Sequence, residues 1–186
     1  EDVKIQIGSA VPMEEEITMA VKGRDYLTGL PRSVDVNTNE IVRAVSKELR
    51  MMIGAILAAA GADVEHLPVV ADEQEAHREV LAQGLEADAL VTSGGVSMGP
   101  HDLVRRITAE LGVEEVFWGV AVKPGKPLSF GVRGATLVFG LPGNPVSSLV
   151  GTLLFAAQAI LARQGLARPG PAFDAGRAAV AQRRNP

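Results

Sequence analysis

Two lysines and a serine, carried on two turns late in the chain, are residue types that bind an oxyanion. The first turn is Lys123-Pro-Gly-Lys126-Pro127, in which the prolines and glycine prevent a helix, so that both ammonium groups extend from a constrained turn. The second turn, Gly140-Leu-Pro-Gly-Asn-Pro-Val-Ser147, predicts a helix start with Asn144 as N-cap and Pro145 as the first helical residue. Ser147 then falls among the unpaired first-turn N–H groups, which attract anions. Either turn alone is typical of many folds, but the two together predict an anion site.

A glycine-rich loop supplies a third set of polar groups. The apolar run 89–93 ends at Ser93 and is followed by Gly94-Gly95-Val-Ser97-Met-Gly99 and then by a helical pattern from about Asp102. Glycines let the backbone approach a phosphate closely, and serine hydroxyls can donate hydrogen bonds to it. The carboxylate of Asp102 can hold a divalent cation or orient a water, and it can equally act as a helix N-cap.

The elements that must position these loops alternate along the chain. This alternation predicts an α/β fold of three layers, with a mostly parallel sheet and helices on both faces, and ligands of such sheets bind at the carboxyl ends of the strands. Strand-like runs at 16–22 and 33–37 predict a small N-terminal β appendage. The expected helices are 38–60, 73–86, 101–112 and 145–164, and the expected strands are 63–70, 88–93, 115–122, 127–132 and 135–140.

Composition limits the classes of function. The 186 residues are 47% hydrophobic and 22% charged, which is enough for one moderate core, and the net charge of −4 argues against nucleic acid as the main partner. The absence of cysteine excludes disulfides and thiolate metal sites and is compatible with a cytoplasmic location. The apolar runs 51–60 and 146–162 are expected to be too short or too punctuated to span a membrane, and we expect no signal peptide, because the N-terminal residues are charged.

Three motifs in the order found in one family carry a resemblance over about residues 50–165. The chain resembles the molybdopterin molybdotransferases, the MoeA and gephyrin E-domain group, whose fold is also that of the MoaB/Mog-like domains. The matching segments are Thr92-Ser-Gly-Gly-Val-Ser-Met-Gly99 with Asp102, Phe117-Trp118 leading into Val122-Lys-Pro-Gly-Lys-Pro-Leu128, and Gly140-Leu-Pro-Gly-Asn-Pro-Val-Ser-Ser148.

The resemblance implies a role in molybdenum cofactor biosynthesis. It implies binding of adenylylated molybdopterin and molybdate, with molybdate insertion and Mg²⁺-dependent release of AMP, in a cytoplasmic protein that forms a homodimer. Asp102, Ser97 and Lys126 are the implied catalytic residues, and Asp102 is the implied magnesium ligand. The implied substrate-binding residues are Ser93, Gly94, Gly95, Lys123, Pro127, Asn144, Pro145 and Ser147.

The chain also departs from this family. Pro100 and His101 precede Asp102 where the family usually has an acidic residue, and neither the family's Gly-Asp-Glu-Leu segment nor its C-terminal β domain is matched here. Whether the chain is an enzyme is therefore left open. The alternatives are a non-enzymatic scaffold that uses the same fold, as in the gephyrin branch, and an actin-like cytoskeletal fragment.

The actin-like alternative arises from the first 45 residues. Glu1-Asp-Val-Lys4-Ile-Gln-Ile-Gly-Ser-Ala10 and the segment from Glu15 to Pro31 resemble bacterial actins of the MreB family. The two resemblances meet inside one expected helix, between about Val45 and Met52. We therefore expect an actin-like fragment at 1–45, a molybdopterin-binding domain at 46–166 and a flexible tail at 167–186, joined by a recombination, as a fusion artefact or as a deliberate chimera.

Overall fold

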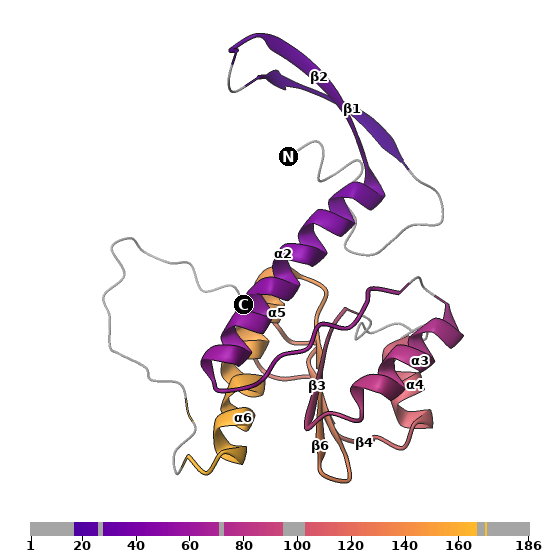
Figure 1. Ribbon diagram of the computed structural model, residues 1–186, viewed down its shortest axis with the longest axis vertical. Helices are drawn as coiled ribbons and strands as arrows, with labels where there is room; N and C mark the ends of the chain where they lie inside the picture. The colour runs from indigo at the N-terminus through magenta and orange to yellow at the C-terminus, as the bar shows by residue number, and fades with distance from the viewer. Residues whose placement is uncertain (1–16, 26–27, 71–72, 95–102, 167–169, 171–186) are drawn as a thin grey trace.

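The computed structural model describes residues 17–25, 28–70, 73–94, 103–166 and 170. Over these residues, a four-stranded sheet lies between two layers of helices, and a two-stranded hairpin stands on the end of a long helix, away from the sheet (Figure 1). The expected α/β class, the helices on both faces and the N-terminal β appendage are confirmed.

The sheet is mixed in its strand directions. Its order is β3-β6-β5-β4, with β3 and β6 parallel and the other two pairings antiparallel. The expectation of a mostly parallel sheet is thus met at one of the three described pairings. A tight connection at 134–135 joins β5 to β6, with Gly134 at φ +58°, and such a short loop can only join antiparallel strands. The strands are β3 (Ala89–Ser93), β4 (Glu114–Trp118), β5 (Ser129–Arg133) and β6 (Thr136–Leu141).

The expected strand at 63–70 is wrong, because this segment forms no strand pairing. It passes between the helix layers, where a Cβ on Gly54 would lie 2.8 Å from His66 and a Cβ on Gly84 would lie 3.0 Å from Leu67. Pro68 also lacks the N–H that a central strand must donate. Val64 and Leu67 of this segment are therefore half-buried against the two cores rather than held in a ladder, whereas Val69 is 62% exposed.

One helix layer consists of two helical segments that pack along each other. The long helix α2 (Thr38–Ala59) runs beside a continuous helix made of α5 (Pro145–Gly151), the π-helical turn η1 (Thr152–Ala156) and α6 (Ala157–Arg163). This layer and one face of the sheet form the larger core. Its fully or nearly fully buried side chains include Leu49, Ile53, Leu57, Leu128, Phe139, Leu141, Ala156 and Ile160.

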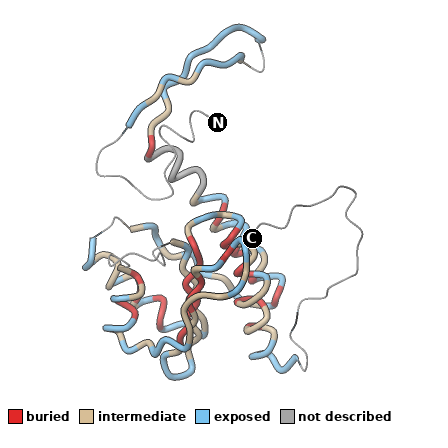
Figure 2. Tube along the Cα trace, turned by 180° about the vertical axis from the view of Figure 1, so that it is seen from behind, coloured by how far each residue is buried: buried red, intermediate tan, exposed pale blue. Residues whose placement is uncertain are grey.

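The other layer consists of α3 (Gln74–Gly84) and α4 (Leu103–Glu110), which pack together over the opposite face of the sheet. The smaller core lies beneath them, and Ile107 is completely buried in it. Figure 2 shows the buried residues concentrated in the sheet and in the helices that cover it, whereas the hairpin is exposed or half-buried along its strands.

The hairpin pairs β1 (Thr18–Arg24) with β2 (Pro31–Asn37) in antiparallel register. It is joined to α2 at Thr38, whose side chain is completely buried. The N–H of Thr38 donates to the Ile17 carbonyl at 3.0 Å, and the hydroxyl of Thr38 accepts from the Ile17 N–H at 3.3 Å. This exchange fixes the base of the hairpin to the first residue of the helix.

One helix of the described chain, Pro145–Arg163, is long and apolar enough to cross a membrane, with a mean hydropathy of 1.7. The expectation that this run is too short or too punctuated is therefore wrong in length and composition. In the fold, 39% of the apolar window is buried, and Ala156, Ala157 and Ile160 belong to the larger core. The core helices of soluble proteins can have the same length and composition. Length and composition by themselves therefore do not identify Pro145–Arg163 as a membrane-spanning helix.

Candidate functional site

The start of the glycine loop lies against the second turn, at the carboxyl ends of β3 and β6. The N–H of Gly94 donates to the Leu141 carbonyl at 2.9 Å, and Gly94 has φ +92°, which glycine adopts without strain. Next to it, the Ser93 and Ser148 hydroxyl oxygens are 3.3 Å apart. The parallel pairing of the two strands thus brings together two motifs that lie about 50 residues apart in sequence, as parallel pairing does for strand ends in general.

The second turn starts a helix as the sequence predicts. Asn144 is the N-cap, with its side-chain oxygen accepting from the Ser147 N–H at 3.2 Å, and Pro145 is the first helical residue. The Asn144 carbonyl accepts from the Ser148 N–H at 2.9 Å. Since proline has no N–H and Asn144 already binds the Ser147 amide, Val146 carries the first-turn amide that is left for an anion.

Ser147 itself is buried, with 6% of its surface exposed. Its hydroxyl donates to the Asn144 side-chain oxygen at 3.4 Å, which is a long hydrogen bond. A serine hydroxyl has a single proton to donate, so an anion bound here must compete with Asn144 for it.

The lysine turn folds back on itself at the end of β4. The N–H groups of Val120 and Leu128 both donate to the Lys126 carbonyl at 2.9 Å, and the Lys123–Pro124 peptide bond is cis. A Cβ on Gly125 would lie 3.7 Å from the Ser147 carbonyl oxygen. The lysine turn therefore packs against the first turn of α5, on the same edge of the sheet as the glycine loop.

The two lysine side chains are exposed and form no ion pair with any residue in the described part of the chain. Pro127, at the end of the same turn, is half-buried. No described carboxylate therefore neutralises their charges, and the turn that carries them packs on the start of α5. The structure thus brings Ser93, Gly94, Lys123, Lys126, Pro127, Asn144, Pro145 and Ser147 to one edge of the sheet.

Three predicted site residues, Gly95, Ser97 and Asp102, lie outside the described residues, as does His101. Over the described ranges, no group of three or more His, Asp or Glu side chains is placed to hold a metal ion. The expected magnesium ligand thus stays a prediction from the sequence.

Ser148 is a residue of this edge that the sequence analysis did not single out. It is completely buried, and its hydroxyl donates to the Pro142 carbonyl while lying beside Ser93. Its role is to join the end of β3 to the turn that precedes α5. The only sequence signal was its place next to Ser147 in the motif, which does not reveal which of two adjacent serines faces inward.

An open cavity of about 440 Å³ lies elsewhere, between α4 and the strands β4 and β5. None of the sequence-predicted site residues lines it. Its walls are formed by Arg105, Arg106, Thr108, Ala109, Val113, Glu115, Ser129, Phe130, Gly131 and Val138.

Comparison with known proteins agrees with the order of the motifs. Residues 36–162 match the family described as "Probable molybdopterin binding domain". The chain belongs to this family. Residues 1–68 also match the MreB/Mbl protein family, so the two matches overlap along α2. The resemblance to both families is thereby confirmed.

Similar proteins include a "Molybdopterin molybdenumtransferase" of Synechocystis, 44% identical over 46% of this chain and 23% of its own. "Molybdenum cofactor synthesis protein cinnamon" of Drosophila melanogaster is 39% identical over 59% of this chain and 18% of its own. Among solved structures, the molybdopterin biosynthesis MoeA protein of Pyrococcus horikoshii aligns with TM-score 0.55 and 29% identity, over 64% of this chain and 29% of that one. The chain thus spans less than a third of the length of each of these proteins.

Proposed function

We propose that the chain acts in molybdenum cofactor biosynthesis by binding adenylylated molybdopterin and molybdate at the edge formed by the three loops. The observation that carries this proposal is the packing of the lysine turn on the start of α5, with Gly94 hydrogen-bonded to Leu141 beside it. Family membership and the names of the relatives supply the substrate class.

The described groups suit a tetrahedral dianion. Molybdate carries two negative charges, which match the two ammonium groups of Lys123 and Lys126, and its oxygens can accept from the Val146 N–H at the start of a helix. Hydrogen bonds from charged donors are stronger than those from neutral ones, so most of the affinity should come from the lysines.

The phosphate end of the substrate is assigned to the glycine loop. In this proposal Ser97 donates to the adenylyl phosphate and Asp102 holds Mg²⁺, because carboxylate oxygens are ligands that this ion prefers. The ion would neutralise negative charge on the pterin phosphate while water cleaves the bond between that phosphate and AMP. Molybdenum would be inserted at the two dithiolene sulfur atoms of the pterin substrate. This chemistry belongs to the substrate and not to the side chains of the protein.

Calorimetric titration with molybdate, and with adenylylated molybdopterin plus Mg²⁺, tests the proposal. We expect Lys126→Ala to weaken molybdate binding by about 10- to 100-fold, the value of a charged hydrogen bond. Lys22→Ala is the matched control, since Lys22 is an exposed lysine on strand β1 of the hairpin, which stands away from the sheet, and it should leave binding unchanged. Wild-type protein that gives no heat with either ligand would overturn the proposal.

A second candidate, a non-enzymatic scaffold, is favoured by a different observation. Met51 and Met52 on α2 and Leu153 on η1 are exposed, at 57%, 50% and 49%, although they are large apolar side chains. Such residues are frequent at protein interfaces. Sedimentation analysis distinguishes this candidate, because a scaffold or homodimer that uses these residues should dissociate in a Met52→Glu variant. For the role in molybdenum cofactor biosynthesis, we also propose a cytoplasmic location and no nucleic-acid or membrane partner.

A further inference from the structure

The open cavity between α4 and the strands β4 and β5 has room for a second ligand. Strand β5 leaves this space because the residues that it turns towards α4 are the small Ser129 and Gly131. Phe130, which lies between them in the sequence, packs its ring on Phe139 in the larger core, on the other face of the sheet. The volume of about 440 Å³ is in the range of pockets that hold small organic molecules.

The hydroxyl of Ser129 is a buried polar group that lacks a partner. Ser129 is a wall residue of the cavity and is 9% exposed, and its side chain forms no hydrogen bond with any described residue. Buried hydroxyls are nearly always hydrogen-bonded, because leaving one unpaired costs free energy. The cavity is the place where an acceptor for this hydroxyl can bind.

A second donor without an acceptor lies on the same face of the sheet. Trp118 on β4 is the Cα partner of Ser129 on β5, so both side chains point to the same side of the ladder. The indole N–H of Trp118 is buried and donates to none of the described residues. Two neighbouring hydrogen-bond donors at this end of the cavity thus lack acceptors.

Arg105 connects α4 to β4 at the wall of the cavity. Its Nε and Nη2 donate to the two carboxylate oxygens of Glu115, both at 2.8 Å, which is the bidentate geometry. Its guanidinium carbon also lies 5.4 Å from the ring centre of Trp118, within the range of a cation–π contact. A planar fork held on a carboxylate and stacked on an indole has a fixed orientation, so this part of the wall is formed before any ligand binds.

The wall carries an excess of positive charge. Arg106 follows Arg105 on α4, is 54% exposed, and lies 3.8 Å from its nearest carboxylate oxygen, on Glu110. The charged residues among the described wall residues are two arginines and one carboxylate, that of Glu115, which gives a net charge of one positive unit. The whole chain, in contrast, has a net charge of −4. The cavity is therefore a locally cationic site in an acidic chain, and it favours an anion.

The remaining wall is suited to an apolar body. Ala109 on α4, Val113 before β4 and Val138 on β6 supply aliphatic side chains, and Val138 is 7% exposed. Covering such side chains with an apolar group is favourable, and pockets of this kind combine an apolar lining with a few polar groups that orient the ligand.

We propose that this cavity binds a small organic carboxylate. The carboxylate oxygens accept from the Ser129 hydroxyl and from the arginine side of the wall, and the apolar body lies on the aliphatic side chains. A single negative charge matches the one net positive charge of the wall better than the nearly double charge of a phosphate monoester does. This site is separate from the edge that carries the proposed function and does not depend on it.

Benzoate is the probe that tests the proposal, and benzamide, which has nearly the same shape without the charge, is its control. Trp118 is the sole tryptophan of the chain, and the guanidinium over its ring belongs to a wall residue, so its emission and its indole N–H signal in NMR report on occupancy. We expect benzoate to give a saturable change with a dissociation constant of about 1 mM or lower, and benzamide to bind about tenfold more weakly.

Two variants each remove one proposed donor. Ser129→Ala and Arg106→Gln should each weaken benzoate binding by about tenfold, the value of a charged hydrogen bond. Ser129→Ala should also leave the midpoint of thermal unfolding unchanged or raise it, because the hydroxyl that it removes has no described partner. Arg32→Gln is the matched control, since Arg32 is an exposed arginine of the hairpin that pairs with Asp25, and it should leave benzoate binding unchanged.

An absence of saturable binding of benzoate to the wild-type protein at millimolar concentrations would overturn the proposal. Equal affinity for benzamide would also overturn it, because the apolar wall alone would then account for binding. Benzoate binding that is unchanged in both Ser129→Ala and Arg106→Gln would place benzoate outside the cavity, with the same consequence. A failure of molybdate to bind would count against the proposed function and would leave these results unaffected.

Discussion

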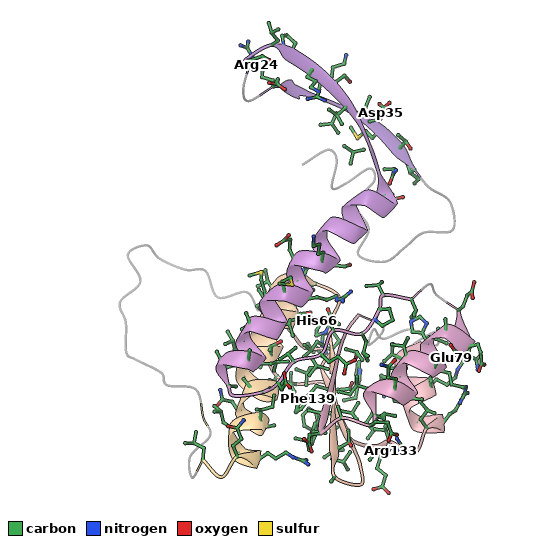
Figure 3. The ribbon with its side chains drawn as sticks, viewed as in Figure 1. Arg24, Asp35, His66, Glu79, Arg133 and Phe139 are labelled. Atoms are coloured by element: carbon green, nitrogen blue, oxygen red, sulfur yellow. The ribbon has the colours of Figure 1, made fainter. Side chains whose placement is uncertain are left out.

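The N-terminal hairpin and the sheet of the main body are both built from short strands of five to seven residues, yet they differ in what covers them. In the hairpin, the apolar pairs Met19–Val36 and Val21–Val34 lie on one face, and Val34 is still 47% exposed. In the body, Phe139 on β6 is 3% exposed, between the sheet and the layer of α2 and α6 (Figure 3).

The difference teaches that pairing alone does not make a core. Two strands provide hydrogen bonds and cross-strand contacts but leave their apolar face in water, and isolated hairpins are marginally stable. The four-stranded sheet is covered by helices on both faces. An apolar side chain of a given type is therefore more fully buried there and contributes more to the free energy of unfolding than it does in the hairpin. The predicted site lies at the edge of the covered sheet, where its loops have a rigid support.

The largest expected effect is at the centre of the body. Leu141→Ala should lower the free energy of unfolding by about 2–5 kcal/mol, because Leu141 is completely buried and the change leaves a cavity. Leu30→Ala, at the tip of the hairpin, where Leu30 is 64% exposed, should change it by less than about 0.5 kcal/mol. Urea unfolding measures the change in the free energy of unfolding for both variants. Equal losses would contradict the conclusion that apolar side chains stabilise the main body more than the hairpin.

A glycine-to-alanine pair sharpens the comparison at the level of single atoms. A Cβ on Gly131 in β5 would lie 2.8 Å from the Glu114 carbonyl oxygen, so Gly131→Ala should cost about 1–3 kcal/mol of stability. A Cβ on Gly23 in β1 would meet nothing within 4 Å, and its φ is not positive, so Gly23→Ala should be neutral or stabilise by up to about 1 kcal/mol. The shift in the midpoint of thermal unfolding tests both expectations. Destabilisation by Gly23→Ala would contradict the open space that surrounds Gly23 in the hairpin.

The next effect concerns the helix start at the candidate site. Asn144→Ala removes the N-cap of α5 and should cost about 1 kcal/mol of stability. It also frees the Ser147 N–H and hydroxyl, which now donate to Asn144, so molybdate binding should be kept or strengthened. Denaturant unfolding and calorimetry on the same variant check the two parts, and a large loss of affinity without a loss of stability would place Asn144 on the ligand instead.

The smallest effect is expected within the hairpin itself. Val34→Ala removes one cross-strand contact with Val21 and should change the free energy of unfolding of the body by less than about 0.5 kcal/mol. Limited proteolysis should nevertheless cut the hairpin faster in this variant, because among the described strands β1 and β2 pair only with each other. An unfolding midpoint that falls together with faster cleavage of the body would show that the hairpin supports the main core.

Local patterns gave the elements of the fold nearly everywhere. The strand-like runs at 16–22 and 33–37 correspond to β1 and β2, and Asn144 and Pro145 begin a helix as expected. Gly94 after β3 and the lysine turn after Val122 lie against the same turn and helix start, 141–147. The error at 63–70 has a physical origin. An alternating apolar segment reads as a strand in isolation, whereas its actual partners are His66 against Gly54 and Leu67 against Gly84, on two different helices.

In the candidate site as well, local features could be predicted from the sequence and contacts between distant residues could not. Residue types and spacing predicted the non-helical turn that carries the two lysines and the capped helix start at Asn144, because turns and caps depend on a few neighbouring residues. The contact of Arg105 with Glu115 and Trp118 spans 10 and 13 positions, across a helix end and a strand, and nothing in the local sequence marks it. The buried Ser148 was likewise hidden next to Ser147.

The sequence by itself determined the family and the α/β alternation, and it supplied the chemical groups that we propose for the site, since these follow from residue type, short-range sterics and periodicity. Tertiary structure alone decided the mixed strand order, the placement of the lysine turn on the first turn of α5, and the connection through Arg105. Which strand neighbours which, and which side chain meets which across layers, depends on how the whole set of apolar surfaces is buried at once. That is a property of the folded chain and of no single segment.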